Sequence, residues 1–249
     1  MIVEYHRPES LEAALELLAR PGMVTVPLGG GTVLNQPLPD PVAVVDLQAL
    51  GLNTLEEKGK KLYIGATVTL QQLLDFEIAP ALKTAIRHQA TYNLRQVATI
   101  AGTLVATDGR SPFATALLAL GAELTLLPAD EVQNLGDFLP LRATRHLNQL
   151  IIQIAIPANV KFAYEYVART PADLPIVCAA VAQWPSGRTR LALGGYGSAP
   201  LLAMDGPEPD GAEAAARGAY HEAGDQWASA EYRSDVAATL ARRCLDSQS

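Results

Sequence analysis

The sequence predicts an α+β fold, in which a small α/β subdomain and a mixed α+β subdomain precede a small C-terminal domain. Residues 42–46 form a run without alternation, four apolar residues followed by Asp46, as expected of a strand buried on both faces. Elsewhere in the first two thirds of the chain, apolar residues recur at helical spacing behind residues that favour helix starts. Segments 161–167, 176–184 and 188–193 have strand patterns and predict a three-stranded antiparallel sheet packed with helices.

Composition limits the classes of protein that this chain can belong to. Its 249 residues are 49% hydrophobic and 18% charged, which is typical of a folded globular protein. The net charge of −7 argues against a nucleic-acid partner, because such proteins usually present a basic face. No signal peptide and no long apolar stretch is visible, so we expect a cytoplasmic protein without a membrane span.

The first elements follow from helix and strand signals. Ser10 is a good N-cap for a helix that runs to Ala19, with apolar residues along one face. A strand over 24–28 follows, and then the buried strand over 42–46. Together they indicate a small α/β subdomain with a ligand site at the strand ends.

The middle of the chain contains a hairpin and several helix starts. Residues 58–61 indicate an exposed hairpin turn, and 69–72 have the spacing of a capping box. Pro80 suits the first position of a helix. Ser111 and Pro112 begin another helix, which Gly121 ends.

The C-terminal part has its own strand and helix patterns. Residues 161–167 alternate and predict a half-exposed strand, and a turn at 185–187 joins the next two strands. A turn at 194–197 carries Tyr196, which could approach a ligand or simply pack. A final helix begins near Ser229 and is expected to bury Val236, Ala237, Leu240, Ala241 and Cys244.

A run of three glycines, Gly29-Gly30-Gly31, follows the predicted strand over 24–28 and precedes Thr32. Glycine leaves no side chain between its amide and a ligand, and successive N–H groups in such a turn can form an anion site. A tight turn without a ligand explains the same residues. The stretch alone therefore leaves both interpretations open.

Common catalytic and metal motifs are not present in the sequence. The two cysteines, Cys178 and Cys244, are too few to hold an iron–sulfur cluster of the common types. The four histidines are scattered, so a metal site is not expected. There is no G-x-S-x-G, H-E-x-x-H or phosphate-loop lysine, and no G-x-G-x-x-G for dinucleotide binding in the Rossmann manner.

Two loops in order resemble a known family. Gly29-Gly30-Gly31-Thr32 is similar to its Ala-Gly-Gly-Thr motif, and residues 94–103 to its Ile-Arg-Asn-x-Ala-Thr-Ile-Gly-Gly-Asn motif. The chain thus resembles the FAD-binding medium subunit of the molybdenum hydroxylases, of the xanthine dehydrogenase and aerobic carbon monoxide dehydrogenase type. Supporting matches lie at 7–8, 64–66, 117–122, 154–157, 190–195 and 230–233.

The resemblance implies a domain division and a cofactor site. Residues 1–158 would form the FAD-binding domain, with subdomains of about 1–52 and 53–158, and residues 159–249 a C-terminal α+β domain. It implies that the flavin supplies the reactivity, without catalytic side chains or metal ligands. Arg95 and Arg110 are candidate counter-charges, although surface ion pairs explain them as well. The residues expected to bind FAD are Leu28, Gly29, Gly30, Gly31, Thr32, Val33, Thr99, Ala101, Gly102, Thr103, Asp108 and Ile151.

By the same resemblance, the chain is an oxidoreductase subunit for electron transfer. Substrate would be oxidised in a partner with the molybdenum cofactor, and electrons would pass through an iron–sulfur partner to FAD and then to NAD or another acceptor. Ala101, Thr103 and Pro112 depart from the family pattern, where glycine, asparagine and often aspartate stand. Two alternatives therefore remain: a stand-alone FAD oxidoreductase, or a relative that has lost FAD and serves as a non-catalytic interaction subunit.

Overall fold

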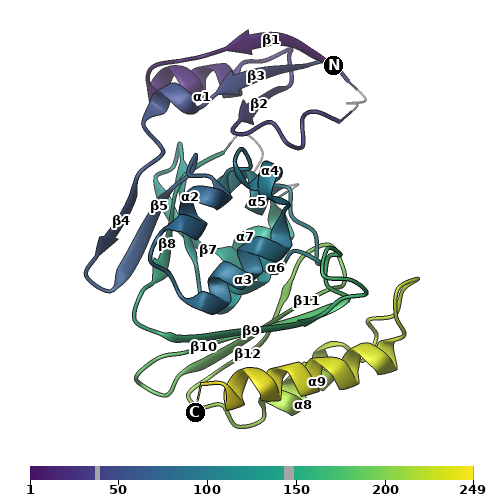
Figure 1. Ribbon diagram of the computed structural model, residues 1–249. Coiled ribbons are helices and arrows are strands. Elements are labelled where there is room, and N and C mark those ends of the chain that lie inside the picture. The colour runs from purple at the N-terminus through teal and green to yellow at the C-terminus, as the bar shows by residue number, and fades with distance from the viewer. Residues whose placement is uncertain (37–39, 143–148, 249) are drawn as a thin grey trace. The chain divides into compact units, whose positions relative to one another are not determined.

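The computed structural model describes residues 1–36, 40–142 and 149–248 (Figure 1). Its contacts divide the chain into two compact units, each assembled from three separate segments. Unit 1 consists of Met1–Phe76, Tyr92–Ala106 and Glu123–Ala155. Unit 2 consists of Glu77–Thr91, Thr107–Ala122 and Ile156–Ser249.

Unit 1 contains two sheets and several short helices. Its elements are β1 (Ile2–His6), α1 (Leu11–Ala19), β2 (Thr25–Leu28), β3 (Val42–Asp46), the 3-10 helix η1 (Gln48–Leu50), β4 (Leu55–Lys58), β5 (Lys61–Gly65), α2 (Leu70–Asp75), α4 (Tyr92–Arg95), α5 (Ile100–Val105), β6 (Glu123–Leu127), β7 (Glu131–Asn134), α7 (Leu135–Leu141) and most of β8 (Leu150–Pro157).

The smaller sheet of unit 1 is parallel and has the strand order β1-β3-β2. Every residue of the central strand β3 is buried, Asp46 at its end included, as its run without alternation predicts. Helix α1 begins directly after the predicted N-cap, Ser10, whose Oγ accepts a hydrogen bond from the Ala13 N–H at 3.2 Å. Ala14 and Leu18 of α1 pack in one core with Val45 of β3. Since all strands run the same way, their carboxyl ends meet at one edge.

The larger sheet of unit 1 has the order β4-β5-β8-β6-β7. The predicted hairpin joins β4 to β5, and Gly59 has a left-handed φ of 66° in its turn. The predicted capping box is present at α2, where Thr69 and Gln72 exchange side-chain-to-backbone hydrogen bonds of 3.2 and 2.8 Å. Thr67 and Thr69, just before α2, line the site described below.

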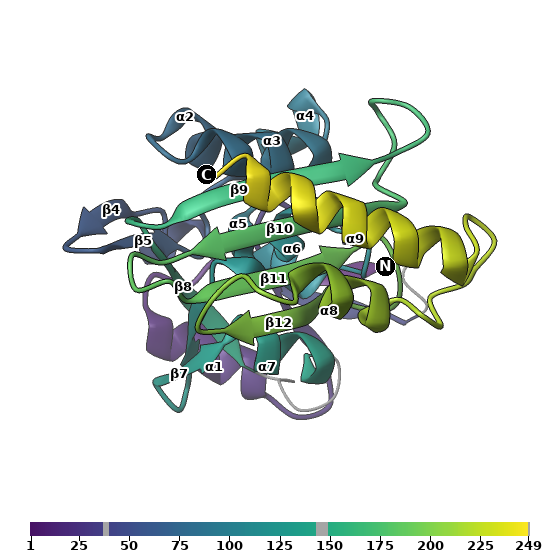
Figure 2. The same ribbon diagram turned by 90° about the horizontal axis from the view of Figure 1, so that it is seen from below.

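Unit 2 is a four-stranded antiparallel sheet with helices on both faces. Helices α8 and α9 cover one face (Figure 2), and α3 and α6 pack on β9, β10 and β11 from the other. The elements are α3 (Pro80–Gln89), α6 (Pro112–Ala119), β9 (Lys161–Val167), β10 (Val177–Gln183), β11 (Thr189–Gly194), β12 (Leu201–Gly206), α8 (Ala212–Ala219) and α9 (Ala230–Asp246), and the strand order is β12-β11-β10-β9.

Several predicted features of unit 2 are confirmed. Ser111 caps α6, Pro112 is its first residue, and Gly121 follows its end with a φ of 67°. The turn over 185–187 joins β10 to β11. Ser229 caps α9, whose predicted core residues are buried apart from Val236, which is partly exposed.

Two expectations for unit 2 are wrong in detail. The sheet has a fourth strand, β12, which lies at the edge and has only partly buried or exposed residues, so no clear alternation marks it. Strand β9 is not half-exposed, because α3 and α9 both contact it and Ala163 and Tyr164 are buried. The mixed α+β class is confirmed, while the predicted domain boundary after residue 158 stays a prediction.

Among the helices that the structure describes, none is both long enough and apolar enough to cross a bilayer.

Candidate functional site

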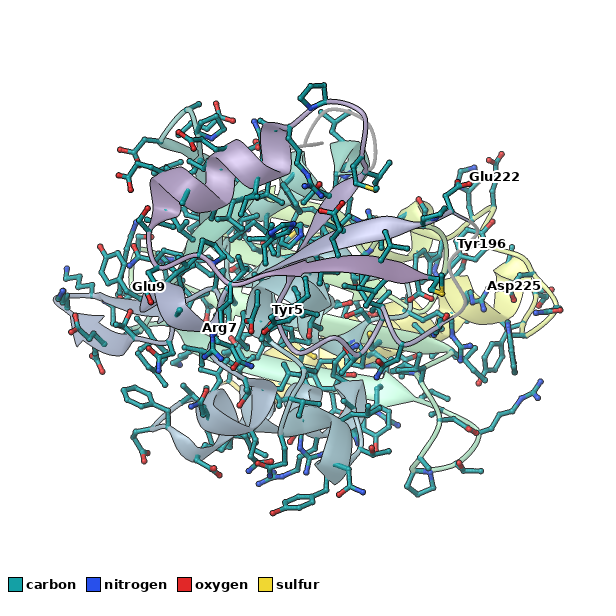
Figure 3. The ribbon with its side chains drawn as sticks, turned by 90° about the horizontal axis from the view of Figure 1, so that it is seen from above. Tyr5, Arg7, Glu9, Tyr196, Glu222 and Asp225 are labelled. Atoms are coloured by element: carbon teal, nitrogen blue, oxygen red, sulfur yellow. The ribbon has the colours of Figure 1, made fainter. Side chains whose placement is uncertain are left out.

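A cavity of about 430 Å³ lies in unit 1 at the carboxyl ends of the three parallel strands. This volume falls within the range of small-molecule sites, and ligands of parallel sheets usually bind at this edge. Tyr5 and Arg7, which come from β1 and the residue after it, lie close together (Figure 3). The lining residues are Tyr5, Arg7, Leu28, Gly29, Gly30, Asp46, Gln48, Thr67, Thr69, Gln96, Val97 and Thr99.

The glycine loop after β2 presses directly against the loop before α5. A Cβ at Gly30 would lie 1.6 Å from the Val97 carbonyl oxygen, and one at Gly29 would lie 2.5 Å from Thr99 Oγ1. Gly31 adopts a left-handed φ of 69°. Each of these positions therefore requires glycine, and the two loops predicted to share a ligand are in contact.

The main-chain donors of this glycine loop are available for a ligand. Among the residues that the structure describes, the N–H groups of Gly29–Val33 have no hydrogen-bond acceptor. An N–H group that is buried without a hydrogen-bond acceptor costs free energy. Several such groups in one loop favour a negatively charged ligand. The residues Gly29–Thr32 are only partly exposed, so a ligand here would satisfy several donors at once.

The second loop is built differently. Thr99 caps α5, with its Oγ1 accepting from the Gly102 N–H at 3.2 Å and its carbonyl from the Thr103 N–H at 2.9 Å. The N–H groups of Ile100 and Ala101 donate to the carbonyls of Val68 and Ala66 at 2.8 and 3.3 Å. Because these donors are occupied, the second loop contributes a wall and the Thr99 side chain, while the first loop contributes the free donors.

The carboxylate of Asp46 and the guanidinium of Arg7 line the cavity at the carboxyl-terminal edge of the parallel sheet. Asp46, at the end of β3, is 4% exposed and accepts hydrogen bonds from the Tyr5 hydroxyl and, at 2.9 Å, from the Gln48 N–H. The hydrogen bond to Asp46 raises the pKa of Tyr5, because the carboxylate disfavours the phenolate. Arg7 Nε lies 3.9 Å from Asp46 Oδ2 and is 55% exposed, so it adds positive charge to the cavity.

The structure brings together part of the residue set that the sequence predicts. Leu28, Gly29, Gly30 and Thr99 line the cavity, and Gly31, Thr32 and Val33 continue the same loop. Ala101, Gly102 and Thr103 belong to α5, which lies directly behind Thr99. The roles of all these residues in cofactor binding stay predictions.

The remaining predicted residues lie outside the cavity lining. Asp108 belongs to unit 2, where its Oδ1 accepts a hydrogen bond from the Arg110 N–H at 2.8 Å. Ile151 is a buried residue of β8. Arg95 donates to the Gln71 side chain at 3.2 Å, and Arg110 donates to the carbonyls of Leu174 and Pro175. Their predicted ligand contacts are untested.

Sequence reasoning missed most of the polar lining. Asp46 carried a usable signal, because it ends a buried strand at the edge where ligands bind. Thr67 and Thr69 carried none, since their position depends on the bridge between Thr69 and Thr99, which joins distant segments. Tyr196, for which the sequence allowed either role, packs against Tyr220 and under the guanidinium of Arg233, whose carbon lies 5.1 Å from its ring centre.

This arrangement can hold a ligand that carries a negatively charged group. The free N–H groups of Gly29–Val33 would bind the charge, and Thr99 and Arg7 flank the same cavity. The described lining residues include no Ser, Cys, Lys or His, and the hydroxyl of Tyr5 donates to the carboxylate of Asp46.

Comparison with known proteins identifies what the chain resembles. Residues 1–159 match the family described as the FAD-binding domain in molybdopterin dehydrogenase. The chain is 33% identical to the uncharacterised protein YgfM of Escherichia coli K12, over 82% of this chain and 79% of that protein. It is 28% identical to the carbon monoxide dehydrogenase medium chain of Afipia carboxidovorans, over 98% of this chain and 95% of that protein. The structure of reconstituted CO dehydrogenase from Oligotropha carboxidovorans superposes with a TM-score of 0.84 at 26% identity, over 98% of this chain and 96% of that one.

Proposed function

Because the chain belongs to the family of FAD-binding domains in molybdopterin dehydrogenases, we propose that it is the FAD-binding electron-transfer subunit of a molybdenum hydroxylase complex. In this proposal, electrons arrive from the iron–sulfur clusters of a partner subunit and leave for NAD or another acceptor. Bound FAD supplies the ability to exchange electrons singly and in pairs. The protein supplies position and electrostatics.

One observation carries the proposal. The unpartnered N–H groups of Gly29–Val33 line up at the carboxyl ends of parallel strands, where they suit the pyrophosphate of FAD. The glycines that form this loop leave no space for a Cβ on the side of the second loop. The residues present therefore fit the cofactor of the family.

Two of the three departures from the family pattern, Ala101 and Pro112, are compatible with FAD. Ala101 lies inside α5, with an ordinary helical backbone and its N–H bonded to Ala66, so no glycine is required there. Pro112 opens α6 and is buried. These two positions therefore give no structural reason to assign the chain to a relative that has lost FAD.

Partner subunits are proposed from the name of the medium chain of Afipia carboxidovorans, of which the alignment covers 95%. Both cysteines of this chain are fully buried, and their thiols have raised pKa values because of burial. Iron–sulfur clusters would therefore be held by another chain, and the molybdenum cofactor by a third.

The first experiment is a visible absorption spectrum of the purified full chain, followed by release and identification of the chromophore. Flavin bands and released FAD are expected. Amide hydrogen exchange should then show slower exchange at residues 29–33 when FAD is present than when it has been removed. A colourless chain that takes up no added FAD would contradict the proposal and favour a non-catalytic interaction subunit.

A second experiment separates a subunit from a stand-alone enzyme. The tagged full chain should co-purify from its own cells with a cysteine-rich, iron-containing subunit. Efficient NADH oxidation with a simple electron acceptor by the isolated chain, together with no such partner, would indicate a stand-alone FAD oxidoreductase.

A further inference from the structure

A second cavity, of about 250 Å³, lies within unit 2 and is lined by two arginines and a tryptophan. The guanidinium carbons of Arg110 and Arg169 lie 4.7 and 4.9 Å from the ring centre of Trp227. Stacked guanidinium groups keep their planar edges free to donate hydrogen bonds. The remaining lining residues are Ala172, Asp173, Leu174 and Ile176.

Neither guanidinium is neutralised by a carboxylate of the described chain. Arg110 donates only to main-chain carbonyls, at 2.7 Å to Leu174 and 3.2 Å to Pro175, which fix its position. Arg169 makes no hydrogen bond and no ion pair with any residue that the structure describes. In a protein with a net charge of −7, two arginines without acidic partners in one cavity are unusual.

Neither neighbouring carboxylate among the described residues forms an ion pair with Arg110 or Arg169. Asp173 lines the cavity, but its Oδ2 accepts a hydrogen bond from the Thr170 N–H at 3.2 Å. The Oδ1 of Asp225 accepts a hydrogen bond from the main-chain N–H of Trp227 at 2.7 Å, and the carboxylate forms an ion pair with the buried Arg233. Asp225 therefore fixes the tryptophan backbone, and the cavity keeps an excess of positive charge.

We infer that this Arg110–Trp227–Arg169 pocket binds a phosphate group. A phosphate offers several oxygens to two guanidinium edges, which is the pairing that arginine forms best. The cavity is too small for a whole dinucleotide and suits a phosphate or the phosphorylated end of a small metabolite. The pocket lies in unit 2 and does not include the glycine loop, so the inference does not rest on FAD binding to that loop.

The test uses the fluorescence of Trp227 in the full chain. Trp184 is the other tryptophan, so W184F leaves Trp227 as the only indole. Titration with inorganic phosphate in a phosphate-free buffer should give a saturable change in emission. AMP should compete, and an affinity about tenfold higher than that of phosphate would identify a nucleotide as the source of the group. Equal affinities would identify free phosphate.

Removing a positive or a negative charge from the pocket should change the affinity for phosphate in opposite directions. R169Q should weaken phosphate binding about tenfold, while D173N should strengthen it about threefold because a like charge is removed. R188Q is the matched control, since Arg188 also stacks on a tryptophan, Trp184, but pairs with Asp205 outside the pocket. It should leave phosphate affinity unchanged.

Calorimetric titration of the wild-type chain with phosphate gives the same answer if W184F does not fold. No saturable binding of phosphate or AMP to the folded chain would overturn the inference. An affinity unchanged in R169Q would do the same, as would binding of acetate but not of phosphate.

Discussion

At Gly30 the chain leaves no room for a side chain, because the Val97 carbonyl occupies the place of a Cβ. We expect Gly30→Ala to separate the two loops, to lower the free energy of unfolding by about 1–3 kcal/mol and to weaken FAD binding by more than tenfold. Thermal unfolding and flavin content measure the two effects. Gly218→Ala is the control, because nothing lies within 4 Å of a Cβ there and α8 should tolerate alanine. Equal flavin content in both variants would contradict the proposed role of the loop.

Arg233 is the largest fully buried side chain of the described residues. Its guanidinium donates to the Ile176 and Ala223 carbonyls and forms two bonds of 2.9 and 3.0 Å with Asp225 (Figure 3 labels Asp225). Arg233→Met should lower the free energy of unfolding by about 3 kcal/mol, because two carbonyls and a carboxylate lose their donor.

Urea unfolding of Arg217→Met provides the comparison for that variant. Arg217 also pairs with an aspartate, Asp235, but both side chains are more than half exposed. Arg217→Met should therefore lower the free energy of unfolding by less than about 1 kcal/mol. Similar losses in the two variants would mean that burial does not decide the contribution of Arg233.

At the scale of elements, one acidic residue joins the last two strands of the sheet in unit 2. Asp205 of β12 accepts hydrogen bonds from Arg188 at 2.8 and 2.7 Å and from Arg190 of β11 at 3.1 Å. The hydrogen bond from Arg188 lowers the pKa of Asp205 below its usual value of 3.8. Because the folded pKa is lower than the unfolded one, this stabilisation is present above about pH 4 and is lost as the pH falls through the folded pKa.

Asp205→Asn should therefore be less stable than the wild type at neutral pH, and the difference should shrink as the pH falls below about 4. Urea unfolding at a series of pH values measures this. Asp235→Asn, at an exposed pair, should show a small difference throughout. A difference for Asp205→Asn that is the same at pH 7 and pH 3 would show that the ion pair does not cause it.

The helices and strands that could be predicted carry signals that act between near neighbours, whereas β1, η1, α4, α5, β6, β7, α7, β8 and α8 were not predicted. The caps at Ser10, Thr69 and Ser111 each depend on a residue about three positions away, and all three form as expected. Strand β12 escaped prediction because an edge strand without a buried face has no regular pattern. Coverage of β9 on both faces depends on α3 and α9, which lie far away in the sequence.

The same distinction explains what could be predicted of the candidate site. Gly29–Gly31 could be found because a triple glycine is itself unusual and its function is local. Asp46 had a local signal as the end of a buried strand. Thr67 and Thr69 required knowledge of how separate segments meet, since the Thr69–Thr99 bridge brings their segment to the cavity.

At the scale of the whole molecule, the two units are interleaved in the sequence. All eight residues of α6 are buried, and α6 packs on β10 and β11, which lie beyond residue 158. A fragment of residues 1–158 should therefore expose apolar surface, bind a hydrophobic dye and melt at a lower temperature than the full chain. A fragment that melts cooperatively at the temperature of the full chain would contradict this and would support the proposed domain boundary.

Interleaving also has a consequence for synthesis. The chain passes between the two units five times, so unit 2 cannot be completed until its last strands leave the ribosome. Helix α6 ends at Ala119 and its partner β10 begins at Val177, which at common translation rates is a delay of roughly 3 to 12 seconds. During that interval α6 cannot bury its apolar surface against β10 and β11, because these strands have not yet been synthesised. Nascent chains of this protein are therefore expected to depend on chaperones that bind early, and codons that slow translation between 120 and 176 would increase aggregation.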